Sequence, residues 1–331
     1  MDLTTRYLGL DLPHPFVAGA SPLSDSVGRA RWLEECGAAA IVLRSLFEEQ
    51  LDAEALAHHH ASELHAHSFA EASTYLPDPS ECVFGPEEYL DHLRRVREAV
   101  QVPVIASLNG YTLGGWLRYA REFERAGAHA IELNLYSVST DPAESAEEIE
   151  ELAVEMVQDV KRTVAIPVAV KLSPFYTSLA HFAHRLCDAG ADGLVLFNRF
   201  FETDIDADEL EVRTHLELSK PSELLLRLRW LAILSGSVKC SLAVTGGVHS
   251  AKDAIKAILC GADTVQMVSL LLEEGAQRLR QTRELMTAWM QERGYQSIAQ
   301  MRGSMNLSRA PDPKAYERAN YMRVLQTWRM D

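Results

Sequence analysis

A lysine and a pair of glycines are the residues of this sequence whose type and position most directly suggest chemistry. Lys171 interrupts an otherwise apolar run, residues 168–172. A lysine in a buried strand needs a partner or a function, because an unpaired buried charge is costly. Gly246 and Gly247 follow a short apolar strand and precede a helical segment, so their backbone N–H groups could approach a phosphate closely. The alternatives are an ion pair between Lys171 and Glu132, and a tight turn that binds nothing.

Polar side chains also end the other apolar runs. Asparagine amides and serine hydroxyls both donate and accept hydrogen bonds, so they suit a ligand with several heteroatoms. The set comprises Ser21 with the small Ala20 before it, Arg44, Ser45, Ser107, Asn109, Glu132, Asn134, Asn198, Thr245 and Ser269. Each residue alone is more often a structural hydrogen-bonding group. Their recurrence at successive strand ends favours a ligand site.

The elements that carry these residues follow a repeating pattern. Four times a helix end is followed by Gly-Ala and then by a strand, with the glycines at Gly37, Gly127, Gly190 and Gly261. Eight apolar runs are near-continuous, as expected for strands covered on both faces. The predicted strands are residues 16–20, 39–45, 103–109, 130–135, 167–173, 193–198, 242–248 and 264–269. Because amphipathic helical stretches separate them, we predict an α/β fold, a (β/α)8 TIM barrel, with an open doubly wound sheet as the alternative.

We expect residues 1–331 to form a single barrel domain with two long insertions. Residues 48–89, after strand 2, are expected to form a long helix and a proline-rich turn. Residues 200–222, after strand 6, form an acidic excursion. Both insertions follow carboxyl ends of strands and are expected to cover the face where barrel chemistry lies. Residues 270–331 are expected to form one or two carboxyl-terminal helices with a polar end.

Composition limits the classes of partner. The chain has 331 residues, 47% of them hydrophobic, and a net charge of −15. This charge argues against a nucleic-acid-coating surface and against adhesion to anionic membranes. We find no signal peptide and no run long enough to span a membrane. The histidine run within residues 58–67 is interpreted as a solvated helix face, so no metal is expected.

The five cysteines have no paired spacing and indicate reduced thiols in a cytoplasmic protein. They lie at Cys36, Cys82, Cys187, Cys240 and Cys260. Cys36, Cys187 and Cys260 lie near predicted helix ends and are expected to be small buried hydrophobic residues.

Several of these segments resemble the dihydroorotate dehydrogenase family, whose members are FMN-containing (β/α)8 barrels. The resemblance is carried, in order, by TTRYLGLDLPHPFVAGAS, IELNLYSVS, VAVKLSP, LAVTGGVHSAKDAIKAILCGADTVQMVS and GYQSIAQMRG. It implies an FMN-dependent oxidoreductase that converts dihydroorotate, a small-molecule substrate, to orotate in pyrimidine biosynthesis. It also implies a cytoplasmic homodimer. The chain begins directly at the first predicted strand, so we expect it to lack the helical extension with which quinone-using relatives meet the membrane.

The resemblance also implies roles for individual residues. For the cofactor, it implies that Ala20 and Ser21 line the flavin ring and that Lys171 faces the pyrimidine end of that ring. Arg44 stands where the family usually has a lysine, with Ser45 beside it, and Asn109 and Asn134 are implied to contact the flavin. The phosphate is implied to bind Gly246, Gly247 and Ser269. For the substrate, it implies contacts from Asn134, Ser139 and Asn198.

The substrate half of the site departs from the family pattern. Where the family has Ser-Cys-Pro-Asn, residues 136–139 read Tyr-Ser-Val-Ser. Ser137 falls at the position of the catalytic base, a cysteine in class 1 and a serine in class 2, with Tyr136 and Cys82 as alternatives. The loop Asn-x-Met-Gly-Leu-Pro-Asn is replaced by DPSECVFGP near residues 78–86, and Gly-Gly-Leu-Ser-Gly by residues 216–220. The flavin half therefore matches the family better than the orotate half.

Two other functions remain open. An FMN-binding homologue could act on a different substrate, or pass electrons to a soluble acceptor or a larger oxidoreductase. A flavin-free, phosphate-binding barrel, either a lyase or isomerase or a non-catalytic subunit, would use only the Gly246–Gly247 loop.

Overall fold

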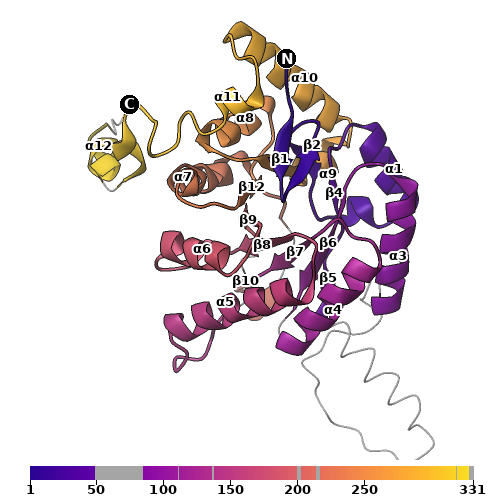
Figure 1. The fold of residues 1–331 in the computed structure, drawn as a ribbon. Helices are drawn as coiled ribbons and strands as arrows, with labels where there is room; N and C mark the ends of the chain where they lie inside the picture. Colours follow the sequence, from indigo (N-terminus) through magenta and orange to yellow (C-terminus); the bar gives the residue numbers. More distant parts are fainter. Residues whose placement is uncertain are drawn as a thin grey trace, which may run out of the picture.

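The computed structural model contains a closed barrel of eight parallel strands surrounded by helices (Figure 1). It describes residues 1–48, 85–110, 112–135, 138–199, 203–213, 217–317 and 319–327. The barrel strands are β3 (Phe16–Ala18), β4 (Ile41–Val42), β6 (Val104–Asn109), β7 (Ala130–Asn134), β8 (Val168–Leu172), β9 (Gly193–Leu196), β12 (Ser241–Thr245) and β13 (Thr264–Met267). The short β5 (Leu46–Phe47) also pairs with β6, and β4 closes the barrel by pairing with both β3 and β6. The predicted (β/α)8 fold is confirmed, and each strand lies within its predicted range except for Ser241, which begins β12 one residue early.

Helices follow the barrel strands and cover the outside. They are α1 (Val27–Glu35), α3 (Pro86–Ala99), α4 (Leu113–Arg125), α5 (Ala146–Thr163), α6 (Leu179–Asp188), α7 (Leu224–Leu234), α8 (Ala251–Cys260), α9 (Ser269–Glu274), α10 (Arg278–Glu292), α11 (Ile298–Met301) and α12 (Ala319–Thr327). Short 3-10 helices are Pro22–Ser24, Pro221–Glu223 and Pro313–Tyr316. The four predicted helix-end glycines all have positive φ angles, between 89° and 121°, which let the chain turn into the next strand. The carboxyl-terminal part holds more helices than the one or two expected.

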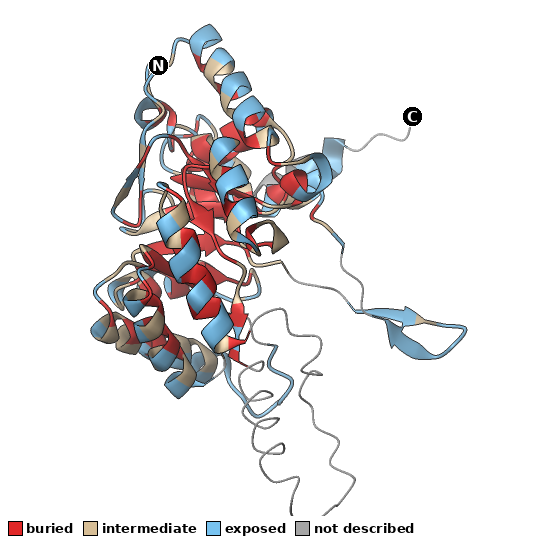
Figure 2. Ribbon diagram, turned by 90° about the vertical axis from the view of Figure 1, so that its right-hand side faces the viewer, coloured by how far each residue is buried: buried red, intermediate tan, exposed pale blue. Residues whose placement is uncertain are grey.

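The residues of the barrel strands alternate between two apolar cores. Outward-facing residues such as Ile131 and Val170 pack against the helices in the larger core. Inward-facing residues such as Ala130, Ala169 and Ala243 belong to a second cluster inside the barrel. Because these alanines are small, the barrel has room for side chains that enter from outside the strands. Figure 2 shows the buried residues concentrated at the centre.

A hairpin closes the amino end of the barrel. It consists of β1 (Thr5–Tyr7) and β2 (Leu10–Leu12), paired antiparallel, and its Tyr7 and Leu8 belong to the inner core. Ser241, the first residue of β12, accepts a hydrogen bond from the Leu8 N–H at 3.2 Å. The expectation that the chain starts directly at the first barrel strand was therefore wrong. Strands of three residues with a single turn are too short for apolar periodicity to reveal.

The two predicted insertions differ in how much of them the structure describes. The expected helix within residues 48–89 lies almost entirely outside the described residues, and α3 already begins at Pro86. In the second insertion, β10 (Asp204–Asp206) and β11 (Glu211–Arg213) form an antiparallel hairpin. This hairpin projects from the body of the molecule (Figure 2).

Two of the cysteines contradict the prediction of reduced thiols. Cys187, at the end of α6, and Cys240, just before β12, form a disulfide with a Cα–Cα distance of 5.9 Å. They are 53 residues apart in sequence, and the parallel pairing of β9 with β12 brings them together. Cys36 and Cys260 are free; Cys260 is buried as expected, whereas Cys36 and Cys187 are only half-buried. No helix among the described residues is long and apolar enough to cross a membrane.

Candidate active site at the carboxyl ends of the strands

Three polar side chains form one hydrogen-bonded group at the carboxyl ends of neighbouring strands. Asn134, the last residue of β7, donates from its amide nitrogen to Ser107 Oγ at 2.9 Å and to the Leu108 carbonyl at 3.0 Å. The same nitrogen lies 3.3 Å from Ser45 Oγ, and the two serine hydroxyls are 2.8 Å apart. The structure thus brings together Ser45 and Asn134, as the sequence predicted. These bonds fix the orientation of the Asn134 amide, which leaves its carbonyl oxygen for other partners.

Lys171 forms the ion pair that was weighed as the alternative to a functional role. Its Nζ lies 3.3 Å from Glu132 Oε1, and the Glu132 side chain is fully buried. Gln266, on β13, donates to the other oxygen of Glu132 at 2.7 Å. A buried carboxylate is tolerated when its oxygens receive hydrogen bonds and a counter-charge, and both are provided here. The ion pair does not exclude contact with a ligand, because Lys171 retains 11% side-chain exposure at the carboxyl end of β8.

The two glycines after β12 form a tight loop against α7. Gly246 and Gly247 have φ angles of +82° and +75°. A Cβ atom on Gly247 would lie 2.5 Å from the backbone nitrogen of Leu224, so a side chain cannot fit there. The Gly247 N–H donates to Ser219 Oγ at 3.0 Å. Glycines ahead of a helix let backbone N–H groups approach an anion closely, and here the Gly247 N–H points to the Ser219 hydroxyl.

Ser219 and Ser269 complete this loop. Their hydroxyls are 2.8 Å apart, and the Ser219 N–H donates to Ser269 Oγ at 3.0 Å. His249 holds the segment from the other side, since its Nε2 lies 2.6 Å from the Ser219 carbonyl. Ser219 was missed because residues 216–220 were read as a departure from the family's Gly-Gly-Leu-Ser-Gly. The retained serine of that segment was the available signal.

A buried arginine supports the loop from α7. Arg227 is 5% exposed and donates through Nε to the Thr245 carbonyl. Its Nη1 donates to the Glu223 carbonyl at 2.7 Å. Burial lowers the pKa of this guanidinium from its ordinary value, with Glu223 acting in the opposite direction. The signal in the sequence was an arginine within the apolar helix LLLRLRWLAIL.

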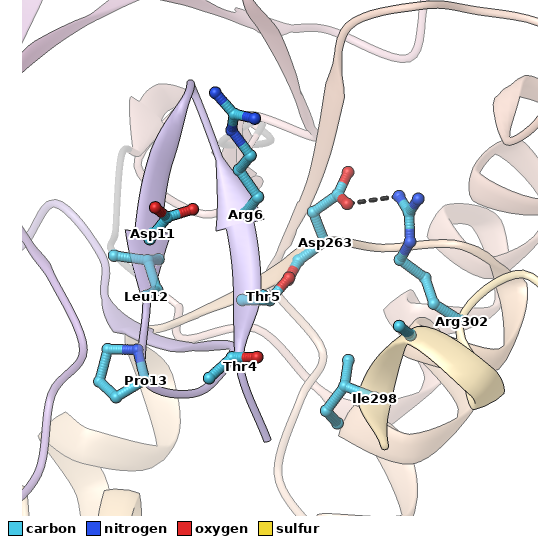
Figure 3. A pocket seen from close by; sticks show the side chains of 10 residues that line it. Thr4, Thr5, Arg6, Asp11, Leu12, Pro13, Asp263, Ile298 and Arg302 are labelled. Carbon is cyan, nitrogen blue, oxygen red and sulfur yellow. Dashed lines mark hydrogen bonds and ion pairs between the residues drawn. The ribbon is translucent and has the colours of Figure 1, made fainter. Parts of the chain in front are cut away.

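A surface pocket lies at the other end of the barrel. It has a volume of about 680 Å³ and is formed by the β1–β2 hairpin, Asp263 and α11. Figure 3 shows the ion pair of Asp263 and Arg302 at its edge. Asp263 precedes β13, so this pocket is at the amino ends of the strands. It is separate from the polar groups of the candidate site.

Comparison with known proteins gives this geometry a context. The family model described as dihydroorotate dehydrogenase matches residues 83–290. The chain belongs to the dihydroorotate dehydrogenase family. The match covers β6 to β13 and therefore every barrel strand that contributes Asn134, Lys171, the two glycines or Ser269.

Three relatives are named as the catalytic subunit of dihydroorotate dehydrogenase B (NAD(+)). The protein of Halalkalibacterium halodurans is 31% identical over 174 residues, which span 50% of this chain and only 56% of that relative. The protein of Thermoplasma volcanium is 26% identical over 91% of this chain and 98% of the relative. That of a Geobacter species is 30% identical over 67% of this chain and 74% of the relative. Homologues of this kind indicate an oxidoreductase of the dihydroorotate dehydrogenase type.

Arg44, which follows β4 and stands where the family usually has a lysine, already has hydrogen-bond partners within the protein. Arg44 Nη1 donates to Asp25 Oδ2 at 2.8 Å, and the Arg44 N–H donates to Ser24 Oγ at 3.0 Å. Burial raises the pKa of Asp25, while Arg44 lowers it. Ser21 is buried beside this pair, and its carbonyl accepts from the Ser24 hydroxyl. These contacts fix the backbone after β3, where Ala20 is half-buried, and the role of Arg44 toward a flavin stays a prediction.

The predicted substrate residues are less well gathered. Asn198 is half-buried two residues after β9, and its N–H donates to the Leu172 carbonyl at 2.7 Å. Asn109, which was assigned to the flavin, is half-buried at the end of β6. Ser139 is exposed and donates to Glu144 Oε2 at 2.5 Å, so it is engaged at the surface ahead of α5. Ser137, Tyr136 and Cys82 lie outside the described residues. Among the described residues, the structure brings together Ser45 with Asn134 and Gly247 with Ser219 and Ser269, whereas Ser139 lies apart at the surface.

The histidine run at residues 58–67 also lies outside the described residues. Within the described ranges, the structure holds no group of three or more His, Cys, Asp or Glu side chains that could hold a metal ion.

Proposed function

We propose that the protein is an FMN-dependent oxidoreductase that oxidises dihydroorotate to orotate, a step of pyrimidine biosynthesis. The observation that carries this proposal is the coincidence of Lys171 and the Gly247–Ser219–Ser269 loop at one end of the barrel. A cation and an anion-binding loop at the carboxyl ends of strands suit a ligand with a phosphate at one end and a polar ring at the other. Membership of the dihydroorotate dehydrogenase family supports FMN as that ligand.

The chemistry of the donor set fits FMN. The Gly247 N–H and the hydroxyls of Ser219 and Ser269 would hold the phosphate, and no side chain fits on Gly247 to obstruct it. Lys171 would contact the pyrimidine edge of the flavin ring. Ala20, Ser21, Asn109, Ser45 and Asn134 would line the ring. When bound, FMN supplies acceptance of a hydride from the substrate.

The residues of the chain supply proton transfer and orientation. Ser137 is proposed as the base, since it follows Asn134 by three residues in the loop after β7. A serine hydroxyl is a weak base at neutral pH and needs help from a neighbour. The fixed amide of Asn134, with Asn198 and Ser139, would orient the substrate. Lys171 places positive charge where negative charge develops during hydride transfer.

A second candidate keeps FMN and changes the substrate. It is favoured by Ser139, which is hydrogen-bonded to Glu144 at the surface, and by the loss of the Pro-Asn pair that family members carry at residues 138–139. In this case the protein would reduce or oxidise another small molecule, or exchange electrons with a soluble acceptor or a larger oxidoreductase. The flavin-free lyase or isomerase remains the least supported alternative, because it leaves Lys171 without a ligand.

The proposal includes a cytoplasmic homodimer with no nucleic-acid or membrane partner. The β10–β11 hairpin supports self-association, since Ile205, Leu210 and Val212 are between 68% and 85% exposed. A short exposed two-stranded hairpin is marginally stable alone and gains from being covered. Sedimentation at the dimer mass is the expected result, and a monomer at all micromolar concentrations would contradict it.

The test of function is anaerobic reduction of the bound flavin by dihydroorotate, followed by stopped-flow absorbance. Wild type is expected to be bleached rapidly, and Ser137→Ala to be slowed by about 100-fold or more, the usual size of a general-base contribution. Cys82→Ala and Tyr136→Phe are controls that are expected to react like wild type. A wild-type protein that binds FMN but is not reduced by dihydroorotate would favour the second candidate.

A further inference from the structure

Inside the barrel, one carboxylate joins strands from opposite sides. Glu132 lies on β7, Lys171 on the adjacent β8, and Gln266 on β13, four strands further around the barrel from β7. Glu132 Oε1 is 3.3 Å from Lys171 Nζ, and Glu132 Oε2 accepts from Gln266 at 2.7 Å. Both Glu132 and Gln266 are at most 1% exposed. Glu132 is thus clamped, and it connects the far wall of the barrel to the lysine.

Stability alone does not require this arrangement. The neighbouring strand residues that face the inner core are apolar, for example Ala130, Ala169 and Val195. A buried ion pair typically stabilises a fold no more than apolar residues of the same volume, because desolvation offsets the attraction. A charge pair among apolar inner residues, toward the carboxyl end where Lys171 retains some exposure, therefore points to a function of the lysine. Glu132 controls the position of the Lys171 ammonium group and offsets part of its positive charge.

We propose that Glu132 is a positioning residue that fixes Lys171 Nζ and partly neutralises its charge, and so sets the reduction potential of the flavin. The proposal rests on the proposed function, in which Lys171 faces the pyrimidine edge of FMN. Lysine alone would favour the anionic reduced flavin. The carboxylate opposes this by adding a negative charge on the protein side of the same ammonium group.

The two partners therefore have opposite effects on the potential. Lys171→Met removes the cation and makes the potential more negative. Glu132→Gln keeps the shape of the side chain but removes the opposing charge, and makes the potential more positive. The new amide can be accommodated, because the Oε1 of Gln266 has no hydrogen-bond partner among the described residues and can accept from it after an amide flip.

A second carboxylate provides a matched control. Asp263 is 7% exposed, is paired with Arg302, and accepts a hydrogen bond from the Leu242 N–H at 2.8 Å. It lies at the amino end of the barrel, away from the candidate site. Asp263→Asn removes a buried, ion-paired charge as Glu132→Gln does, and is expected to leave the flavin potential unchanged.

The experiment measures the midpoint potential of the FMN-loaded protein by spectroelectrochemistry, with thermal unfolding of each variant as a check of folding. Glu132→Gln is expected to favour the reduced flavin about tenfold relative to wild type, which is about 30 mV for a two-electron couple. Lys171→Met should shift the potential by a similar amount in the negative direction. A folded, flavin-loaded Glu132→Gln protein with an unchanged or more negative potential would overturn the proposal.

A measurement on the protein without flavin separates the claim that Glu132 holds Lys171 in place from the claim that the protein binds FMN. In the protein without FMN, acetylation of Lys171 by an acylating reagent is followed by mass spectrometry. Release of the lysine in Glu132→Gln should speed this acetylation about tenfold, and Asp263→Asn should not. Equal rates in wild type and Glu132→Gln would contradict the positioning role. If wild type fails to bind FMN, the proposed function fails, and the acetylation rates alone decide whether Glu132 holds Lys171.

Discussion

The two ends of the barrel are built from opposite kinds of residue. At the amino end, the hairpin β1–β2 inserts Tyr7, Leu8 and Leu12 into an apolar cluster with small strand residues. At the carboxyl end, inward positions of the barrel strands carry polar residues, among them Glu132, Asn134 and Lys171. Glu132 pairs with Lys171, and Asn134 is hydrogen-bonded to Ser107. On β7 the change from apolar to polar takes only two residues, since Ala130 and Glu132 both face the inside of the barrel.

This difference teaches where changes should affect folding and where they should affect chemistry. In barrels of this type, stability is concentrated at the amino face and catalysis at the carboxyl face. Substitutions at the amino end should therefore change the free energy of unfolding and leave FMN affinity intact. Substitutions at the carboxyl end should do the reverse. The four predictions below run from the largest expected effect to the smallest.

Leu12→Ala should be the most destabilising of these changes. Leu12 is 2% exposed in the inner core, and its truncation leaves a cavity under the hairpin. Loss of a buried leucine side chain costs about 2–5 kcal/mol. Urea unfolding measures this change. FMN affinity, titrated under conditions where the variant is folded, should stay within twofold of wild type, and a large loss would show that the two ends are coupled.

Gly247→Ala should reduce FMN affinity by about 100-fold, or about 2.7 kcal/mol. The new Cβ would meet the Leu224 backbone at 2.5 Å and displace the loop from Ser219. Gly9→Ala is the matched control, since Gly9 has a similar φ of +74° but nothing within 4 Å of a Cβ atom. The control should lose about 1–2 kcal/mol of stability from backbone strain alone and bind FMN normally. An equal loss of FMN affinity in the Gly247→Ala and Gly9→Ala variants would contradict the assignment of this loop to the phosphate site.

His14 should make the amino end sensitive to acid. Burial, aided by Arg283, lowers the pKa of His14 to about 4. The unfolded chain, with a histidine pKa near 6.5, binds a proton that the folded protein excludes, so stability falls as the pH drops from about 6.5 toward 4. Between pH 7.5 and pH 5 this one group should cost about 2 kcal/mol.

His14→Asn tests this pH dependence. The asparagine oxygen can still accept the Phe16 N–H that His14 Nδ1 accepts at 3.3 Å, and it does not titrate. Urea unfolding at the two pH values should give a difference about 2 kcal/mol smaller in the variant. An identical difference in both proteins would contradict a buried neutral His14.

Tyr7→Phe should have the smallest effect. The Tyr7 hydroxyl is buried and, among the described residues, has no partner in good hydrogen-bond geometry, although Gln266 lies near enough to lower its pKa slightly against the effect of burial. Burial and the nearby carboxylates of Glu132 and Asp263 raise the pKa of this phenol well above its ordinary value, so it stays neutral. Removing an unsatisfied hydroxyl should be neutral or stabilise by up to about 1 kcal/mol in thermal unfolding. Strong destabilisation would reveal a buried water bonded to the hydroxyl.

The sequence revealed the barrel because its signals are local. Each strand is an apolar run, and each repeat ends a helix with a glycine whose positive φ is needed at that point. Lys171 was found because it is the exception within such a run. The pairing of residues distant in sequence gave no such signal. Gln266 and Glu132 are 134 positions apart, and Cys187 and Cys240 meet only because β9 pairs with β12.

Site residues on the barrel strands could be predicted from the sequence, whereas site residues on loops could not. Asn134 is the last residue of β7, and Lys171 is the penultimate residue of β8. Ser219 comes from the insertion after β9 and reaches Gly247 and Ser269 across 28 and 50 positions, and nothing local indicates this. The same limit applies to Ser139, whose position in the sequence suggested a substrate contact and whose hydroxyl instead bonds Glu144.

The most direct test of the account is the FMN content of the purified protein, before and after reconstitution with FMN. We predict the visible absorbance of a bound flavin, released by denaturation as free FMN at one molecule per chain. Gly247→Ala should be colourless at the same protein concentration while Gly9→Ala stays yellow. A folded wild-type protein that takes up no FMN at micromolar concentrations would contradict the assignment of the carboxyl end as a flavin site.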